Sequence, residues 1–144
     1  LRCREVPGSF PASEVASLRA EGYNTLRLLP GPVSEALLDS CDARGLYVVV
    51  QAPVDTRRSG DSRRVGGNPS NDPAWREAYA ERAANSYHTT KLHPSVIAFS
   101  VAAHSANDIN LYESYLAMKR LHETRPFVYP EAGGEWNSDP LPLE

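Results

Sequence analysis

Two segments of the chain are apolar almost without interruption, and each lies between segments with a helical pattern. Residues 46–52 (LYVVVQA) and residues 96–102 (VIAFSVA) contain no charged side chain. Such a continuous apolar run is typical of a strand buried on both faces of a parallel sheet, because a surface strand alternates apolar and polar positions. Residues 25–29, residues 127–129 and the N-terminal residues are candidates for further strands. The pattern therefore predicts about five strands.

Four other segments carry apolar side chains every three or four residues, which is the spacing of a helix face. They are residues 11–21, 34–44, 72–89 and 110–122. Ser34 is a suitable N-cap for the second helix, Gly45 is a suitable terminator, and Asp72 with Pro73 is typical of a helix start. Strand and helix alternate along the chain, which predicts a parallel α/β domain with right-handed crossovers.

The length of the chain limits how much of such a fold it can contain. A closed barrel of eight strands takes ~250 residues, and this chain has 144. We predict either a partial (β/α) TIM-barrel-like sheet of about five strands with flanking helices, or an independent open sheet. We expect residues 1–144 to be a single domain excised from a longer protein, with residues 143–144 as a cloning scar. An open half-barrel leaves strand edges and an inner face bare, and a homodimer would bury them.

The composition narrows the range of partners. Hydrophobic residues make up 41% of the chain and charged residues 23%, as in an ordinary soluble globular domain. The net charge of −3 gives no general attraction to nucleic acid or to a membrane, and no apolar run is long enough to span a bilayer. Cys41 is expected to be a small core residue, with a Cys3–Cys41 disulfide as the alternative. No signal peptide is visible and the chain begins at Leu1, so the compartment stays open; a secreted or periplasmic parent protein is one candidate.

Five short motifs follow one another along the chain. They are GYNTLR at 22–27, LDSCDARGLYVV at 38–49, NDPAW at 71–75, HPSVI at 93–97 and TRP at 124–126. In this order they resemble the catalytic barrel of glycoside hydrolase family 2, the β-galactosidase and β-glucuronidase group. The resemblance implies a TIM barrel, retaining hydrolysis of glycosides, a carbohydrate ligand, and a site at the carboxyl ends of the strands.

The chain departs from this family at the positions that carry the chemistry. The proton-donating glutamate of the family corresponds to His104, and the asparagine before it corresponds to Ala103. A glutamate at the end of the third strand corresponds to Gln51, and the resemblance places the nucleophile beyond residue 144, after a seventh strand. A retaining glycosidase needs two carboxyl groups ~5–5.5 Å apart. The resemblance therefore leaves open whether this chain is an enzyme, and we expect His104 not to work as its acid/base.

Other side chains are candidates for the mouth of the sheet. The resemblance makes Arg27 a substrate-side arginine, and the alternative is an ion pair with Asp42 or a neighbouring acid. Trp136 is a candidate for stacking on a sugar ring, and the alternative is burial against the sheet. Asp108 shares a loop with His104 and is a candidate substitute acid; otherwise it is a solvated loop acid or the cap of the next helix.

Charged residues near the same edge leave further alternatives. Glu131 and Glu135 follow the last predicted strand and could also supply an acid. The β-galactosidase branch of the family has a glutamate-threonine-histidine sequence that can hold magnesium, whereas residues 55–57 read DTR here. One carboxylate remains and the histidine becomes a cation, so we predict no metal and no cofactor. The arginines within residues 57–64 could hold a phosphate or an acidic sugar, or could simply be solvated.

Three functional interpretations follow. The first is a family 2-like barrel segment that is catalytically silent as it stands, with a carbohydrate-binding or scaffolding role beside other domains of a larger glycosidase. The second is a structural module that dimerises through exposed barrel edges. The third is an active glycosidase in which His104 or Asp108 supplies a non-standard acid/base. None of the three involves a nucleic acid or a membrane as partner.

Overall fold

The computed structural model describes residues 1–132 and 138–140. Its strands form one sheet in the order β1-β2-β3-β4-β5, and every neighbouring pair is parallel. They are β1 (Cys3–Pro7), β2 (Thr25–Leu29), β3 (Tyr47–Gln51), β4 (Val96–Ser100) and β5 (Phe127–Val128). Because neighbours in the sheet are also neighbours in the sequence, the sheet winds in one direction, like part of a barrel wall. The predicted five-stranded parallel sheet is confirmed.

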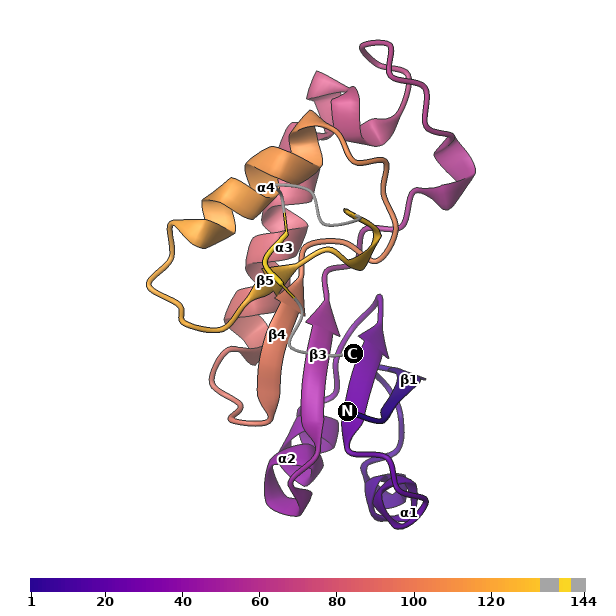
Figure 1. Cartoon of the computed structure of the whole chain (residues 1–144), viewed down its shortest axis with the longest axis vertical. Coiled ribbons are helices and arrows are strands. Elements are labelled where there is room, and N and C mark those ends of the chain that lie inside the picture. The colour runs from indigo at the N-terminus through magenta and orange to yellow at the C-terminus, as the bar shows by residue number, and fades with distance from the viewer. Residues whose placement is uncertain (133–137, 141–144) are drawn as a thin grey trace.

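A helix follows each of the first four strands. The helices are α1 (Val15–Ala20), α2 (Glu35–Arg44), α3 (Arg76–Thr90) and α4 (Ile109–Lys119). Figure 1 shows β3 and β4 running upward side by side, with the long segment between β3 and α3 extending beyond their upper ends. The loops that follow the strands therefore gather at one edge of the sheet.

The residues that the sequence marks as helix ends, Ser34, Gly45 and Asp72, all occupy capping positions in the structure. The Ser34 hydroxyl accepts a hydrogen bond from a backbone N–H in the first turn of α2, at 3.4 Å. Gly45 ends this helix with φ of 69°, a left-handed conformation in which a side chain is strained. The Asp72 carboxylate accepts a hydrogen bond from Ala74 N–H at 3.0 Å, but it caps a 3₁₀ turn at Pro73–Trp75 that leads into α3.

Most of the apolar core lies between the sheet and the helices. Leu26 and Leu28 of β2, together with Val48 and Val50 of β3, are at most 1% exposed. They belong to one large cluster with buried side chains of all four helices. Burial of this face provides the main favourable free energy of folding, because each buried aliphatic side chain contributes about 1.5–3 kcal/mol.

The opposite face of the sheet is more polar and corresponds to the interior of a closed barrel. Val49, Ala98 and Val128 form a second, smaller apolar cluster on this face. The strand register aligns Val49 with Arg27 and Arg27 with Glu5, so these side chains share the same face. Strands β3 and β4 therefore bury both faces near the middle of the sheet, as their continuous apolar runs predict.

The free edge of β5 is covered by a later segment of the same chain. Phe127 N–H donates to Asp139 Oδ2 at 2.9 Å, and Asp139 N–H donates to the Phe127 carbonyl at 2.8 Å. Asp139 also accepts hydrogen bonds from the Tyr115 hydroxyl at 2.7 Å and from Lys119 Nζ at 2.9 Å. The expectation of bare edges is therefore wrong at β5, where Asp139 satisfies backbone groups that a further strand would otherwise meet.

Two smaller expectations concern the thiols and the membrane. Cys3 and Cys41 are both free, so the alternative of a disulfide between them is wrong, and Cys41 is a buried core residue as predicted. Among the helices of residues 1–132 and 138–140, none has the length and apolar character needed to cross a membrane.

Candidate functional site

A cavity of about 380 Å³ lies at the carboxyl edge of the sheet, beyond the ends of β3, β4 and β5. We call it the mouth cavity. Its lining residues are Thr56, Arg57, Gly60, Asp61, His104, Ser105, Ala106 and Glu131. Parallel α/β folds place their binding and catalytic sites at this edge, because the loops that follow the strands converge there.

His104 reaches the mouth cavity because the chain continues in an extended form past β4. Its backbone pairs with that of Asp55 in an isolated parallel bridge, and Thr56 N–H donates to the His104 carbonyl at 2.9 Å. Ala103 N–H and His104 N–H both donate to the Val54 carbonyl, at 2.9 and 3.1 Å. The position of His104 is therefore set by the backbone of the segment that follows β3.

The His104 ring faces a carboxylate. Its Nδ1 lies 2.5 Å from Oε1 of Glu131, and the His104 side chain is 32% exposed. The two residues lie 27 positions apart, just beyond the adjacent ends of β4 and β5. Sequence reasoning placed both residues at the mouth but missed their pairing. Knowledge that β4 and β5 are neighbouring strands would have indicated this contact, because Ser100 and Val128, the last residues of the two strands, lie side by side.

A buried tyrosine holds this pair in place. The Tyr129 hydroxyl accepts a hydrogen bond from Ser105 N–H at 2.9 Å, and it lies 2.5 Å from the Ser105 carbonyl and 3.0 Å from Glu131 Oε2. Burial raises the pKa of Tyr129, so the hydroxyl keeps its proton as a hydrogen-bond donor. The Ser105 hydroxyl in turn shares a hydrogen bond of 2.7 Å with the Tyr79 hydroxyl.

A second charged pair lies beside the first. Arg57 donates from Nε to Asp55 Oδ1 at 3.0 Å and from a terminal nitrogen to Oδ2 at 2.6 Å. These hydrogen bonds are the main reason that the pKa of Asp55 is lowered. The residues that correspond to these in the β-galactosidase branch of the family can hold magnesium, but Asp55 and Arg57 do not fit a divalent cation. A guanidinium has no lone pair for a metal, and it already occupies both oxygens of Asp55.

Gln51 and Arg27 contact each other on the interior face of the sheet. The Gln51 amide donates to the Leu28 carbonyl at 2.9 Å and accepts a hydrogen bond from Arg27 at 3.1 Å. Arg27 also forms an ion pair with Glu5 at 3.4 Å. The structure thus has the alternative in which Arg27 forms an ion pair with a neighbouring acid, which is Glu5. The other alternative, Asp42, is wrong, because that residue contacts His93 instead.

Asp108 does not face the His104 ring. Its Oδ2 accepts hydrogen bonds from the side-chain amides of Asn68 at 3.3 Å and Asn71 at 3.1 Å. Asp108 is the N-cap residue of α4, as one of the alternatives predicted, although its side chain makes no capping hydrogen bond. The carboxylate instead fastens the 62–71 loop, because the two amides that it binds also donate to the Ser62 carbonyl.

Three predicted site residues remain, namely Ala103, Glu135 and Trp136. Ala103 is 3% exposed, so a buried methyl group stands where the resemblance implies a substrate-binding asparagine. Trp136 and Glu135 lie outside the described residues. The mouth therefore brings together His104, Glu131 and the Asp55–Arg57 pair, with Gln51 and Arg27 on the adjoining interior face.

A winding parallel sheet with its charged side chains gathered at the carboxyl edge defines a (β/α)-barrel segment. Residues 3–140 match the family model described as glycosyl hydrolases family 2, TIM barrel domain. The chain belongs to this family, which confirms the resemblance drawn from the five motifs.

Relatives of known sequence and structure agree with this assignment. The chain is 31% identical to a β-galactosidase from Vibrio cholerae over 121 residues. The matched residues make up 84% of this chain and 11% of that protein. A β-galactosidase from Klebsiella pneumoniae is 28% identical over 134 residues, which cover 93% of this chain and 12% of that protein. The chain therefore spans about a tenth of the length of these relatives.

Solved structures show the same fold. A β-glucuronidase from Ruminococcus gnavus in complex with D-glucuronic acid superposes with a TM-score of 0.68 at 18% identity, over 89% of this chain and 23% of that chain. A family 2 glycosyl hydrolase from Bacteroides cellulosilyticus superposes with a TM-score of 0.60 at 22% identity, over 88% and 18% of the two chains. The predicted partial TIM barrel is thus shown.

Proposed function

We propose that this chain is a family 2 barrel segment that binds a carbohydrate at the mouth cavity and does not itself hydrolyse glycosidic bonds. The observation that carries the proposal is the pairing of His104 with Glu131, 2.5 Å apart, at the end of β4. The resemblance to the family places its proton-donating glutamate at this position.

The chemistry of a retaining glycosidase does not suit this pair. Such an enzyme needs one carboxylic acid to protonate the leaving oxygen and a second carboxylate to attack the sugar. Glu131 already contacts His104 and Tyr129, and Asp55 is held by Arg57 through two hydrogen bonds. A protonated imidazole at His104 would also place positive charge beside an oxocarbenium-like transition state, which raises its energy.

The same groups are well suited to hydrogen bonding with sugar hydroxyls. The lining of the mouth cavity combines hydroxyl donors, two carboxylate acceptors and a guanidinium, all at the surface of one cavity. Carboxylates accept hydrogen bonds from hydroxyl groups, and arginine donates several in a fixed geometry. The relatives that are named β-galactosidase and β-glucuronidase indicate galactose and glucuronic acid as the first sugars to test.

The test measures binding and turnover on the whole chain. Calorimetric titration with galactose and with glucuronic acid is compared for the unmodified chain, for Glu131→Gln and for Glu77→Gln. Glu77 is an exposed carboxylate on α3, outside the mouth cavity, and serves as the matched control. Loss of the Glu131 charge is expected to weaken binding of the preferred sugar roughly tenfold, because a hydrogen bond to a charged group contributes about 1.5–3 kcal/mol.

Chromogenic β-galactoside and β-glucuronide substrates complete the test. No turnover is expected from the unmodified chain, and none from His104→Glu, since one restored carboxyl group does not make a pair. Turnover by the unmodified chain would show that a non-standard acid/base operates, and the proposal of catalytic silence would be wrong. If neither sugar binds, the carbohydrate-binding proposal is wrong and scaffolding beside other domains is the remaining role.

The sheet edge at β1 supports a second candidate role, the assembly of two copies. β1 is a terminal strand, and four of its five residues are exposed. One row of its backbone groups faces away from β2, and an unpaired strand edge can pair with the same edge of a second copy. Sedimentation equilibrium tests this role. A concentration-dependent dimer that is lost in Glu5→Pro, which removes a backbone N–H on the outward side of β1, supports it, and a monomer at all concentrations contradicts it.

A further inference from the structure

The long segment between β3 and α3 carries a positive charge that the rest of the chain does not share. Residues 57–64 (RRSGDSRR) contain four arginines and one aspartate, a net charge of +3, whereas the whole chain has a net charge of −3. The other residues therefore carry a net charge of −6. We call residues 57–64 the arginine loop. Residues 52–75 connect β3 to α3 through three 3₁₀ turns, and connections of this length commonly carry a function.

Hydrogen bonds at its base fix the conformation of the arginine loop. The side-chain amides of Asn68 and Asn71 both donate to the Ser62 carbonyl, at 2.9 and 3.3 Å. Gly67 N–H donates to the Arg64 carbonyl at 2.7 Å, and a Cβ at Gly67 would lie only 2.7 Å from the Ser62 carbonyl oxygen. The backbone that carries the arginines is therefore preorganised, which reduces the entropy lost when the loop binds a ligand.

Three of the four loop arginines have no charged partner inside the fold. Arg57 is paired with Asp55 at 2.6 Å. Arg58, Arg63 and Arg64 are exposed, and their side chains form no ion pair with residues 1–132 or 138–140. These three guanidinium groups can therefore contact an external anion without breaking an internal contact.

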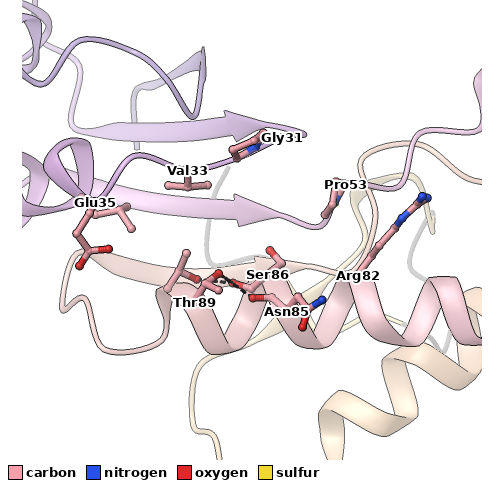
Figure 2. A pocket seen from close by; sticks show the side chains of 11 residues that line it. Gly31, Val33, Glu35, Pro53, Arg82, Asn85, Ser86 and Thr89 are labelled. Carbon is pink, nitrogen blue, oxygen red and sulfur yellow. Dashed lines mark hydrogen bonds between the residues drawn. The ribbon is translucent and has the colours of Figure 1, made fainter.

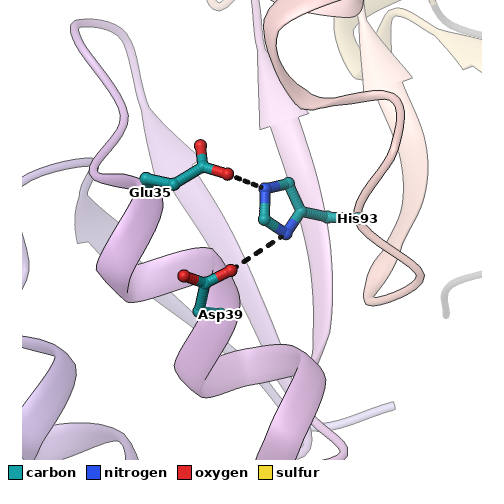
Figure 3. Close-up of side chains that lie close together, drawn as sticks. All are labelled: Glu35, Asp39 and His93. Carbon is teal, nitrogen blue, oxygen red and sulfur yellow. Dashed lines mark hydrogen bonds and ion pairs between the residues drawn. The ribbon is translucent and has the colours of Figure 1, made fainter.

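Elsewhere in the fold, positive charge is neutralised by internal partners, and His93 is an example. Figure 3 shows its ring between Glu35 and Asp39. Its Nε2 lies 2.8 Å from Glu35 Oε1 and its Nδ1 lies 2.7 Å from Asp42 Oδ2, so a protonated ring donates to both carboxylates. The charge of His93 is thus satisfied within the fold, whereas the three exposed loop arginines are left for an external partner.

The arginine loop borders the mouth cavity. Arg57, Gly60 and Asp61 line that cavity together with His104 and Glu131. Figure 1 shows the segment between β3 and α3 beyond the upper ends of β3 and β4, which is the edge of the sheet where the mouth cavity lies. A sugar in the mouth cavity would have the arginine loop beside it, and further units of the same saccharide would pass along the loop.

We propose that the arginine loop binds the anionic groups of an acidic polysaccharide, one unit of which occupies the mouth cavity. This inference rests on the proposed carbohydrate site and adds the class of saccharide. A guanidinium is weakly hydrated and donates paired hydrogen bonds to anions, which suits the carboxylates of uronic acids and sulfate esters. Asp61 and Glu131 line the mouth itself and accept hydrogen bonds from sugar hydroxyls, so the anionic groups that the loop binds belong to units outside the mouth.

Two features favour a polysaccharide over a nucleic acid. Residues 48–74 contain no aromatic side chain on which bases could stack. The net charge of −6 outside the arginine loop opposes a polyanion as broad as a DNA duplex, which would also cover the surface around the loop. A single polysaccharide chain is narrow enough to contact the loop alone.

The test measures binding of the whole chain to polygalacturonate, dextran sulfate and dextran. These probes carry carboxylates, sulfates and no charge, so they separate the two kinds of anion from the sugar backbone. At low salt, at least one acidic polysaccharide is expected to bind about tenfold more tightly than dextran, and added salt should weaken its binding. Arg63→Gln/Arg64→Gln should weaken this binding roughly tenfold, because one exposed charge contact contributes up to about fivefold.

A matched control removes two positive charges from another surface. Arg82 is an exposed residue of α3, and Figure 2 shows it beside a separate cavity of about 430 Å³. Arg120 is exposed at the end of α4. Within the part of the chain that the structure describes, neither forms an ion pair. Arg82→Gln/Arg120→Gln therefore changes the net charge equally, and it should bind acidic polysaccharides as the unmodified chain does.

The inference and the proposed carbohydrate site fail in different ways. The inference is wrong if acidic polysaccharides bind no more tightly than dextran, or if Arg63→Gln/Arg64→Gln binds them no more weakly than the control variant does. Duplex DNA bound as tightly as the polysaccharides would show a general polyanion surface and would also overturn it. Galactose and glucuronic acid should bind Arg63→Gln/Arg64→Gln and the unmodified chain equally. If neither sugar binds, the mouth cavity is wrong as the sugar site, and so is the placement of one unit there.

Discussion

Glu123 and Arg125 connect the segment between α4 and β5 to the rest of the fold through hydrogen bonds. Replacing Glu123 with glutamine should weaken this connection. Arg125 donates to both carboxylate oxygens of Glu123, at 2.9 and 2.8 Å, and to the carbonyl groups of Lys91 at 2.7 Å and Val96 at 3.1 Å. The Tyr87 hydroxyl donates to the same carboxylate at 2.9 Å. The Glu123 side chain is only 9% exposed, so solvent screens these contacts weakly.

The magnitude follows from the titration of this carboxyl group. The Arg125 hydrogen bonds lower the pKa of Glu123 from 4.5 to about 2, against the opposing effect of burial. A depressed pKa stabilises the folded state fully above the unfolded value of 4.5, and the stabilisation is lost as the pH falls toward 2. At about 1.4 kcal/mol per pKa unit, the carboxylate contributes about 3 kcal/mol at pH 7.

Urea unfolding, followed by circular dichroism at several pH values, measures this contribution. Glu123→Gln should lower the free energy of unfolding at pH 7 by about 2–3 kcal/mol, and the difference from the unmodified chain should shrink steadily below pH 4.5. The exposed Glu77→Gln variant controls for loss of one negative charge and should stay within about 0.5 kcal/mol of the unmodified chain. A Glu123→Gln loss that is equally small, or that does not change between pH 7 and pH 3, would refute the reasoning.

Three further substitutions test other parts of the fold by the same unfolding measurement. Leu26→Ala removes a side chain with no exposed surface and should cost about 2–5 kcal/mol, so a loss below 1 kcal/mol would contradict its place in the core. Gly45→Ala puts a side chain at φ of 69° and should destabilise by about 1 kcal/mol; a stabilised variant would be inconsistent with the left-handed cap. Tyr129→Phe leaves Ser105 N–H without its acceptor and should cost about 1–3 kcal/mol, and no change would argue against the buried network at the mouth.

The strands and helices could be predicted because their signals are local. The apolar runs around Val48 and Val96 indicated buried parallel strands, and both β3 and β4 are buried there. Ser34 and Gly45 marked the two ends of α2 correctly, because caps depend on the conformation of a few consecutive residues. The motif order was equally informative about the family, since residues 3–140 match its barrel domain.

The site could be predicted only in part. The position of His104 at the mouth follows from its place just after a strand, since the loops that follow parallel strands share one edge of the sheet. Its partner Glu131 was one of several candidate acids, and only the pairing of β4 with β5 distinguishes it from Asp108. The Asp55–Arg57 pair is adjacent in sequence, yet its two-fold hydrogen bonding depends on side-chain rotamers that no pattern encodes.

By itself, the sequence determined the order of strands and helices, the parallel sheet and the family, because hydrophobic period, capping and motif order act over short stretches of chain. Only the tertiary structure decided which charged side chains meet. Asp42 contacts His93 across 51 positions rather than Arg27, and Asp139 covers the edge of β5. Electrostatic and hydrogen-bonding energies depend on distances of a few ångströms between side chains, and folding sets those distances between segments that are remote in the sequence.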